Sequence, residues 1–308
     1  MYDARVLAHS VSPTGYELVT LAATFPRIIL AEANTHRVLS RNSASSRAIP
    51  VERRIKQIRS SCFIPEAFGK NKSGMRADEP LGEDEDSLAR TIWAKAAEDA
   101  AIHADALAAI GVHKQHANRL IETFAWHTII VTATEWANWD ALRVSKNAQP
   151  EMHKIAGMMR EVRLASVGVA VDYDQWHLPL VRGTPSFGRP IQEIFAEEHD
   201  LRTRGIDPVK VCVGRCAAVS YERHTVDSTP EKDAARYDGL RSNGHMSPFE
   251  HACRPMAPTE LDLFAQPECV WDGSRFLRTG RIRHFLGNVE GWIQQRKMIP
   301  GEDVYTGE

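Results

Sequence analysis

The chain has 308 residues, of which 43% are hydrophobic and 25% are charged, and its formal net charge is −2. This composition is typical of a folded globular protein, and the near-neutral charge argues against a uniformly basic surface for nucleic acid. The apolar runs are too short to span a bilayer, the N-terminus lacks a secretory pattern, and the five cysteines form no C-x-x-C pair. We therefore expect a cytoplasmic protein without a disulfide framework, a membrane anchor or a required nucleic acid partner.

The first part of the chain predicts strands, then loops, then a helix. Residues 4–33 predict strands, with a turn at the Ser-Pro-Thr-Gly cluster of 12–15. Residues 34–80 are polar and contain several prolines and glycines, so we expect loops there, with one short helix near 51–59. An alanine-rich helix is expected over 87–109, after acidic residues that complement a helix N-terminus.

Further helices are predicted over residues 114–138, 150–169 and 230–242. Residues 172–210 are rich in proline and glycine and predict a linker, which the apolar stretch 211–219 follows. Long helices set apart from strand pairs predict an α+β fold, with the helices packed on a small antiparallel sheet. We accordingly divide the chain into residues 1–171, the linker 172–210 and residues 211–308.

The segment Thr35–Arg47 concentrates groups that bind phosphate. Its thirteen residues include three arginines, four serines, an asparagine and a histidine. Guanidinium groups bind phosphate oxygens in a bidentate manner, and hydroxyl groups donate to the remaining oxygens. The segment has no glycine, so side chains rather than a glycine-rich backbone must make these contacts. Composition alone leaves a solvated basic loop as an equal alternative.

The spacing within this segment resembles the R-H-R-x7-S signature of the flavin-dependent thymidylate synthases. His36 and Arg37 are followed, after seven residues, by Ser45. The segment Ala133–Arg143 resembles the family's helix that carries a flavin-contacting Asn and, five residues later, a pyrimidine-binding Arg. A shorter stretch upstream, 117–121, resembles the helix that supplies a second nucleotide-binding Arg.

A third similarity lies out of order in the chain. The segments Arg215–Tyr221 and Gly244–His251 resemble the family's N-terminal region, which ends in a G-H-x-(S/T)-P-F-E-H pattern and precedes the R-H-R motif. Here the same patterns follow that motif, so the chain resembles a circular permutant. Permutation is tolerated where the original termini lie close together at the surface.

The resemblance implies an enzyme that uses FAD, with NADPH and methylenetetrahydrofolate as co-substrates, to transfer a one-carbon unit to C5 of dUMP in dTMP synthesis. It also implies a homotetramer with active sites shared between subunits. Arg143 is the implied catalytic residue, and no metal is implied. The implied binding residues are Glu32, Ser43, Ser45, Ser46, Arg47, Arg119 and Arg143 for the nucleotide, and Thr35, His36, Arg37, Asn138, Asn147, Ser220, His245, Ser247 and Glu250 for flavin.

Several departures from the family pattern leave alternatives open. Thr35 replaces the first Arg of R-H-R, although Arg41 or Arg296 is available to compensate, and Ser43 replaces a Glu. Glu32 stands where the family has a Gln, and a carboxylate can accept a hydrogen bond from the exocyclic amine of cytosine. A methylase or hydroxymethylase of dCMP or dUMP is therefore an alternative, as is a non-catalytic nucleotide- or RNA-binding protein.

Two other enzyme classes receive little support. A cysteine-dependent thymidylate synthase needs an activated Cys, and no cysteine here stands in a Pro-Cys-His context. His113 and His116 have the spacing of helix-borne metal ligands, but the sequence offers no third ligand nearby.

Overall fold

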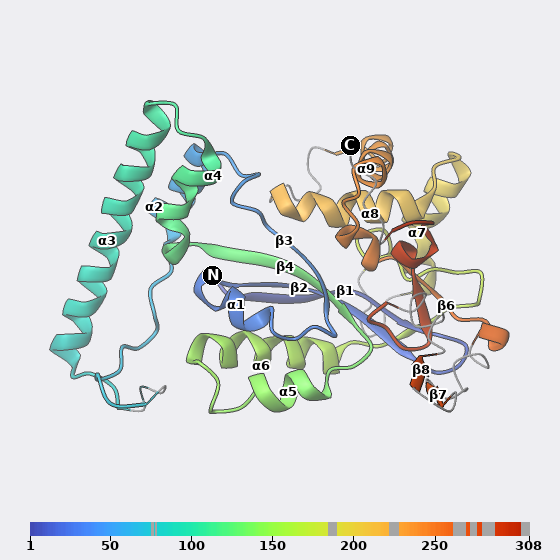
Figure 1. Cartoon of the computed structure of the whole chain (residues 1–308), viewed down its shortest axis with the longest axis horizontal. Coiled ribbons are helices and arrows are strands. Elements are labelled where there is room, and N and C mark those ends of the chain that lie inside the picture. Colours follow the sequence, from blue (N-terminus) through green and yellow to red (C-terminus); the bar gives the residue numbers. More distant parts are fainter. Residues whose placement is uncertain are drawn as a thin grey trace.

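The computed structural model describes residues 1–74, 77, 79–183, 190–221, 228–260, 269–271, 276–278 and 287–302. In this part of the chain a five-stranded sheet has the order β3-β4-β2-β1-β5, with β5 parallel to β1 and the other neighbours antiparallel (Figure 1). Its strands are β1 (Asp3–Val11), β2 (Glu17–Pro26), β3 (Ser40–Ser43), β4 (Trp126–Ala133) and β5 (Val169–Ala170). Two small antiparallel pairs join β6 (Cys253–Pro255) to β9 (Trp292–Gln294) and β7 (Cys269–Trp271) to β8 (Phe276–Arg278). Helices packed on a largely antiparallel sheet confirm the predicted α+β class.

A tight turn joins β1 to β2, where the Ser-Pro-Thr-Gly cluster predicted one. The Ser12 N–H donates to the Tyr16 carbonyl at 2.9 Å, and the Gly15 N–H donates to the Ser12 carbonyl at 2.9 Å. Gly15 has a φ of +87°, a conformation that a residue with a Cβ rarely adopts. The glycine therefore permits the chain to reverse within five residues.

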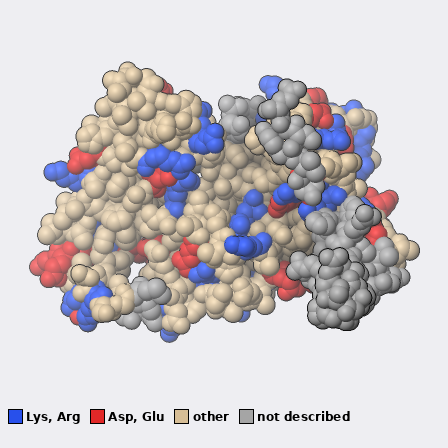
Figure 2. Space-filling model, viewed as in Figure 1, with Lys and Arg blue, Asp and Glu red and all other residues tan. Residues whose placement is uncertain are grey.

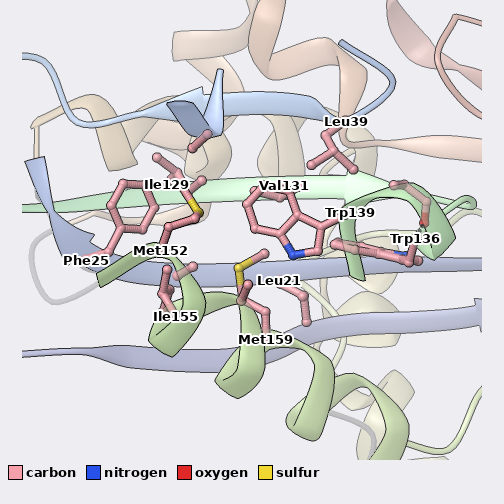
Figure 3. Close-up of a cluster of buried hydrophobic side chains, with 14 of the residues drawn as sticks. Leu21, Phe25, Leu39, Ile129, Val131, Trp136, Trp139, Met152, Ile155 and Met159 are labelled. Atoms are coloured by element: carbon pink, nitrogen blue, oxygen red, sulfur yellow. Dashed lines mark hydrogen bonds between the residues drawn. The ribbon is translucent and has the colours of Figure 1, made fainter. Parts of the chain in front are cut away.

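One face of the sheet packs on α5 (Ala137–Arg143) and α6 (Pro150–Ala165). Side chains of a strand alternate between faces, so the odd-numbered apolar residues of β2 and β4 point to this side. Trp139 of α5 and Met152 and Met159 of α6 fill the space between helix and sheet (Figure 3). Burial of this apolar surface fixes α5, and with it the position of Arg143 at its C-terminus.

The opposite face of the sheet packs on the C-terminal half of the chain. Ala22 and Ile130 contact the core that also contains Val211, Cys212 and Cys216. The elements on this side include α7 (Ile191–Thr203), α8 (Pro208–Ala218), η3 (Val219–Tyr221), α9 (Pro230–Ser242) and η4 (Ser247–Glu250). Residues 211–251 thus reach the sheet from far along the chain.

A third core lies beyond the end of the sheet. It joins α2 (Val51–Ser61), α3 (Glu83–Ala109), α4 (Lys114–Ala117) and η2 (Asn118–Phe124). In Figure 1 α3 forms the left edge of the molecule, with α2 and α4 on its inner side. Among the described residues no helix is long and apolar enough to cross a membrane, and no group of three or more His, Cys, Asp or Glu could hold a metal.

The helix predicted over 114–138 is wrong. Only α4 and α5 at its ends are α-helical, and between them lie the 3-10 helix η2 and the strand β4. The run His-Thr-Ile-Ile-Val-Thr in β4 is rich in β-branched residues, which favour a strand. Pairing with β2 on one side and β3 on the other places β4 inside the sheet.

Smaller predictions also needed correction. The strand region 4–33 ends in the helical turns η1 (Arg27–Ile29) and α1 (Leu30–Ala33), and the helix predicted over 150–169 stops at Ala165. Residues 40–43, predicted as loop, form the edge strand β3 because they pair with β4. The helices predicted at 51–59, 87–109 and 230–242 are confirmed as α2, α3 and α9.

The region predicted as a linker is packed rather than extended. It contains α7, and Leu178, Val181 and Leu201 are buried in the same core as α8. His177 is also fully buried, and its backbone pairs with Cys253. The division of the chain at residues 172–210 stays a prediction.

Candidate functional site

Arg143 is the centre of a group of four side chains, which we call the Arg143 cluster: Glu32, Thr35, His36 and Arg143. The Arg143 guanidinium donates from Nε to His36 Nε2 at 2.7 Å and from Nη2 to Thr35 Oγ1 at 3.0 Å. It donates from Nη1 to the Glu32 carboxylate and forms an ion pair with it. A guanidinium has five N–H donors, so two N–H bonds remain for a ligand.

The Arg143 cluster lies against the core between the sheet and the helices α5 and α6. His36 is buried, and its ring lies edge-on to Trp139, with the ring centroids 4.9 Å apart. Burial, with the neighbouring Arg143 and Arg41 cations, lowers the pKa of His36, although a hydrogen bond with Asn138 opposes the shift. A neutral His36 can use the lone pair of Nε2 to accept from Arg143. The family-derived residues Thr35, His36, Asn138 and Arg143 therefore do lie together.

The strand β3 directs neighbouring side chains to opposite faces. Arg41 Nη1 donates to the His36 carbonyl at 2.6 Å, on the side of the Arg143 cluster. Ser40 and Asn42 turn the other way: Ser40 Oγ accepts from Gln294 at 2.7 Å, and Asn42 Nδ2 donates to the Cys216 carbonyl at 2.6 Å. This alternation follows from the period of two in a strand.

The C-terminal half docks on the second of these faces. The Ser45 N–H donates to the Ser220 carbonyl at 2.9 Å, and Ser247 Oγ donates to Asn42 Oδ1 at 3.4 Å. Glu250 accepts from Arg296 at 2.5 Å, and Arg296 also donates to Glu302 at 2.5 Å, whereas Thr35 is bonded by Arg143. The patterns that resemble the family's N-terminal region thus lie beside the x7-S segment, as the permutation hypothesis requires.

A cavity of about 800 Å³ opens between β3, α4, α8 and α9, and we call it the cationic cavity. Its lining includes three cations, Arg47, Lys114 and Arg236, and two imidazoles, His113 and His245. None of the described residues that line it carries a carboxylate. Three hydroxyl groups also line it, those of Ser45, Ser220 and Ser247. Cations and hydroxyls without a carboxylate suit an anionic ligand such as a phosphate.

Two of the cations in this cavity already have partners. Arg236 Nη1 donates to Asp233 Oδ1 at 2.6 Å and to the Gly214 carbonyl at 2.9 Å. Lys114 Nζ donates to the Ala48 carbonyl at 3.1 Å, which directs it into the cavity beside the x7-S loop. Arg47 is exposed and, within the described part of the chain, forms no hydrogen bond or ion pair through its side chain. Arg47 is therefore the cation most available to a ligand.

Asn118 holds the loop that carries Ser45 and Arg47. Its Nδ2 donates to the Ser46 carbonyl at 2.7 Å and to the Ile49 carbonyl at 2.9 Å, and the side chain is fully buried. The sequence singled out its neighbour Arg119 instead. Arg119 is 53% exposed and pairs with Glu122 at 2.8 Å, outside the cavity lining. Successive residues of a helical turn point in different directions, and here Asn118, not Arg119, bonds to the carbonyls of the loop.

The remaining residues implied by the resemblance lie outside the cavity lining. Arg37 and Asn147 are exposed, Ser43 is half-buried on β3, and Ser46 is buried beneath the loop. His113 caps α4 by accepting from the Gln115 N–H at 3.3 Å, a structural role for one of the two spaced histidines. Lys114, Arg236 and Asn118 were not foreseen, because no family motif marked them and residues 114–138 predicted one long helix.

Comparison with known proteins gives one family match. The sequence model described as thymidylate synthase complementing protein, Thy1, matches residues 6–165. Two solved structures of the UMP/dUMP methylase PolB from Streptomyces cacaoi are similar to this chain. The structure bound with 5-Br dUMP is 13% identical, with a TM-score of 0.44, and the match covers 53% of this chain and 90% of that chain. For the structure bound with 5-Br UMP the values are 14%, 0.45, 53% and 88%. No curated protein matches the chain.

Proposed function

The chain belongs to the thymidylate synthase complementing protein family, and on that premise we propose that it transfers a one-carbon unit from methylenetetrahydrofolate to C5 of dUMP with the help of FAD and NADPH. The observation that carries the proposal is the pairing of a cation-rich cavity with a half-buried Arg143. The first suits a phosphorylated ligand, and the second suits a ring that gains negative charge.

The nucleotide phosphate is assigned to the cationic cavity. Arg47 and Lys114 supply positive charge and Ser45 a hydroxyl donor, and Asn118 fixes the loop between them. We assign to Lys114, which lines the cavity, the phosphate-binding role that the resemblance gives to Arg119. A charge-assisted hydrogen bond to a phosphate oxygen contributes about 1.5–3 kcal/mol, so two such cations contribute about 3–6 kcal/mol of the roughly 8 kcal/mol that micromolar binding requires.

Arg143 is assigned to the pyrimidine ring. Its two remaining N–H bonds can donate to a ring oxygen or nitrogen, and this hydrogen bonding stabilises negative charge on the ring during the reaction. His36 and Thr35 hold the guanidinium plane before the ligand binds, which lowers the entropy lost on binding.

Flavin, when bound, supplies the redox chemistry, and the protein supplies binding and orientation. The cavity volume lies in the range of ligand sites, and Ser220, His245 and Ser247 line its inner wall together with the cations that suit a pyrophosphate. Glu250, near this wall, is held by Arg296. These residues fit the flavin role that the resemblance implies.

Two neighbouring residues of β3, Arg41 and Asn42, point to opposite faces of the strand, and this arrangement supports active sites shared between subunits. Arg41 faces the Arg143 cluster, whereas Asn42 faces the cationic cavity. A nucleotide that contacts Arg143 in one copy therefore needs the phosphate-binding loop of another copy beside it. This geometry is the reason to propose the tetramer that the resemblance implies.

A cytosine nucleotide is the second candidate substrate, and Glu32 favours it. The Glu32 carboxylate lies on Arg143, at the group assigned to the pyrimidine. A carboxylate next to a guanidinium offers an acceptor for the N4 amine of cytosine and donors for its N3 or O2. The product, methyl or hydroxymethyl, depends on whether the C5 adduct is reduced or takes up water.

Purification followed by a tritium-release assay tests these proposals. We expect a yellow protein, or a colourless one that takes up FAD, and release of tritium from C5-labelled dUMP with folate and NADPH. Release of tritium from labelled dCMP alone shows that the substrate is the cytosine nucleotide and not dUMP. A protein that binds a nucleotide but does not bind FAD contradicts the enzyme proposal and favours a non-catalytic nucleotide-binding protein.

A further inference from the structure

Helix α3 carries apolar side chains on two opposite faces. Ala97, Ala101 and Ala104 are buried on the inner face, in the core that also contains α2 and η2. With 3.6 residues per turn, a second apolar stripe falls on the opposite side of the helix. This outer stripe consists of four large side chains that are between 48% and 78% exposed: Leu88, Ile92, Ile102 and the C-cap Ile110.

The outer stripe lies at the edge of the molecule. Figure 1 shows α3 as its left boundary, and Figure 2 shows acidic side chains at the lower end, where α3 begins. From Leu88 to Ile110 the stripe is about 33 Å long, at 1.5 Å per residue. A helix that is apolar on its outer face as well as its inner face marks an interaction surface.

Two charged residues interrupt the stripe at its middle. Lys95 and Asp99 are exposed and one turn apart, within the arc of about 80° that the four apolar side chains occupy. Their order gives the stripe a charge pattern that is complementary to itself when the helix direction is reversed. A second copy of the same helix, laid antiparallel, presents Asp99 to Lys95 and Lys95 to Asp99.

We propose that the outer stripe of α3 binds the α3 stripe of a second copy of this chain, antiparallel about a twofold axis. In this register Ile92 packs on Ile102 of the second copy, Lys95 pairs with Asp99 of the second copy, and each pair occurs twice. Leu88 then packs on Ala106 of the second copy, so a large side chain meets a small one.

The charges select this register over its neighbours. A shift of about one turn in one direction places Asp99 on Asp99 of the second copy, and a shift in the other direction places Lys95 on Lys95. Like charges in contact destabilise a helix pair, whereas opposite charges at these positions stabilise it. None of the stripe residues belongs to the Arg143 cluster or lines the cationic cavity, so this contact is independent of the proposed activity.

Charge-reversed variants of the full chain test the register by sedimentation velocity over a range of protein concentrations. Lys95→Glu places a carboxylate on Asp99 of the second copy, and Asp99→Lys places an ammonium on Lys95. Each single variant is expected to self-associate about tenfold more weakly, because two pairs become repulsive. A mixture of the two variants restores opposite charges at both pairs and is expected to associate as tightly as the wild type.

Apolar variants test the surface itself. Ile92→Asp is expected to remove one step of assembly and to halve the assembled mass. Leu164→Asp is the matched control, because Leu164 is a 65% exposed side chain on α6, away from the stripe, and its replacement leaves assembly unchanged. Far-ultraviolet circular dichroism confirms that each variant is folded. Three results overturn the proposal: assembly that Ile92→Asp leaves unchanged, a wild type that stays monomeric at the highest concentration tested, or a mixture that associates no more tightly than its components.

Discussion

The Arg143 cluster and the cationic cavity differ in how their charges are balanced. In the cluster the guanidinium is held by a carboxylate, an imidazole and a hydroxyl, all from the short stretch 32–36. In the cavity Arg236 is paired with Asp233, but among the described residues Lys114 bonds only to a carbonyl and Arg47 has no side-chain partner. The cluster is therefore organised before a ligand arrives, whereas the cavity gains its missing anion from the ligand.

This contrast suggests that the Arg143 cluster acts in the reaction and that the cationic cavity acts in binding. A charge that is already balanced contributes little to affinity, but its fixed direction lets it stabilise charge that develops later in the reaction. A set of cations without counter-charge contributes mainly to binding. Substitutions in the cluster should therefore affect turnover, and substitutions in the cavity should affect affinity.

The largest effect is expected for Arg143→Ala. Loss of the guanidinium should lower turnover by about 10²–10³-fold, because it removes stabilisation of charge on the ring. Flavin binding should be retained. Tritium release from C5-labelled dUMP measures turnover, and absorbance measures bound flavin. Arg241→Ala, on the exposed end of α9, is the control, and turnover in Arg143→Ala close to that of this control contradicts the assignment.

A smaller effect is expected from the cavity cations. Arg47→Met or Lys114→Met should weaken dUMP binding by about 10- to 100-fold, as expected for a lost charge-assisted hydrogen bond. Isothermal titration calorimetry measures the affinity. Arg119→Met is the matched control, since Arg119 pairs with Glu122 outside the cavity and should change the affinity by less than about twofold. An effect of Arg119→Met as large as that of Arg47→Met restores the family-derived assignment.

Asn118→Leu tests whether Asn118 holds the loop that carries Ser45 and Arg47 in place. The substitution leaves two buried carbonyls, those of Ser46 and Ile49, without their donor. We expect the free energy of unfolding to fall by about 2 kcal/mol, with weaker nucleotide binding as well. Urea unfolding measures the stability. Unchanged stability together with normal binding shows that the loop does not depend on Asn118.

The smallest effect concerns acid pH at the Arg143 cluster. Burial and the nearby Arg143 and Arg41 cations lower the pKa of His36 below its usual value of 6.5. The unfolded chain then takes up a proton below pH 6.5 that the folded chain does not, so stability present above pH 6.5 is lost as the pH falls.

His36→Gln tests this pH dependence, because glutamine does not titrate. Its unfolding free energy should fall less steeply below pH 6.5 than that of the wild type, by up to about 1.4 kcal/mol per pH unit. The comparison is needed because His251, whose pKa burial lowers to about 3, gives both proteins a background slope of the same sign. Parallel slopes in the two proteins contradict the lowered pKa of His36.

Local sequence signals identified candidate site residues one motif at a time, but not which of them come together. His36 and Arg143 were found through motif spacing, and the structure joins them at 2.7 Å. Ser45, Ser220 and Ser247 were found in separate motifs and lie together at one cavity. Arg119 was predicted because residues 117–121 resemble the family's helix with a nucleotide-binding Arg, but the direction of a side chain depends on helix packing, which a motif does not encode.

By itself the sequence determined the hairpin turn at Gly15, the helices α2, α3 and α9 and the family resemblance, because each depends on spacing within a few turns or one strand. Only the tertiary structure joined Arg143 to His36, which lies 107 residues earlier in the chain. Only the tertiary structure decided that β4 is a strand, since its pairing partners lie about a hundred residues away in the chain. Tertiary contacts also decided that Lys114 and Arg236 face the cavity and that α3 keeps an apolar stripe on its outside. These features depend on which faces become buried when distant segments pack, and that burial is a property of the whole fold.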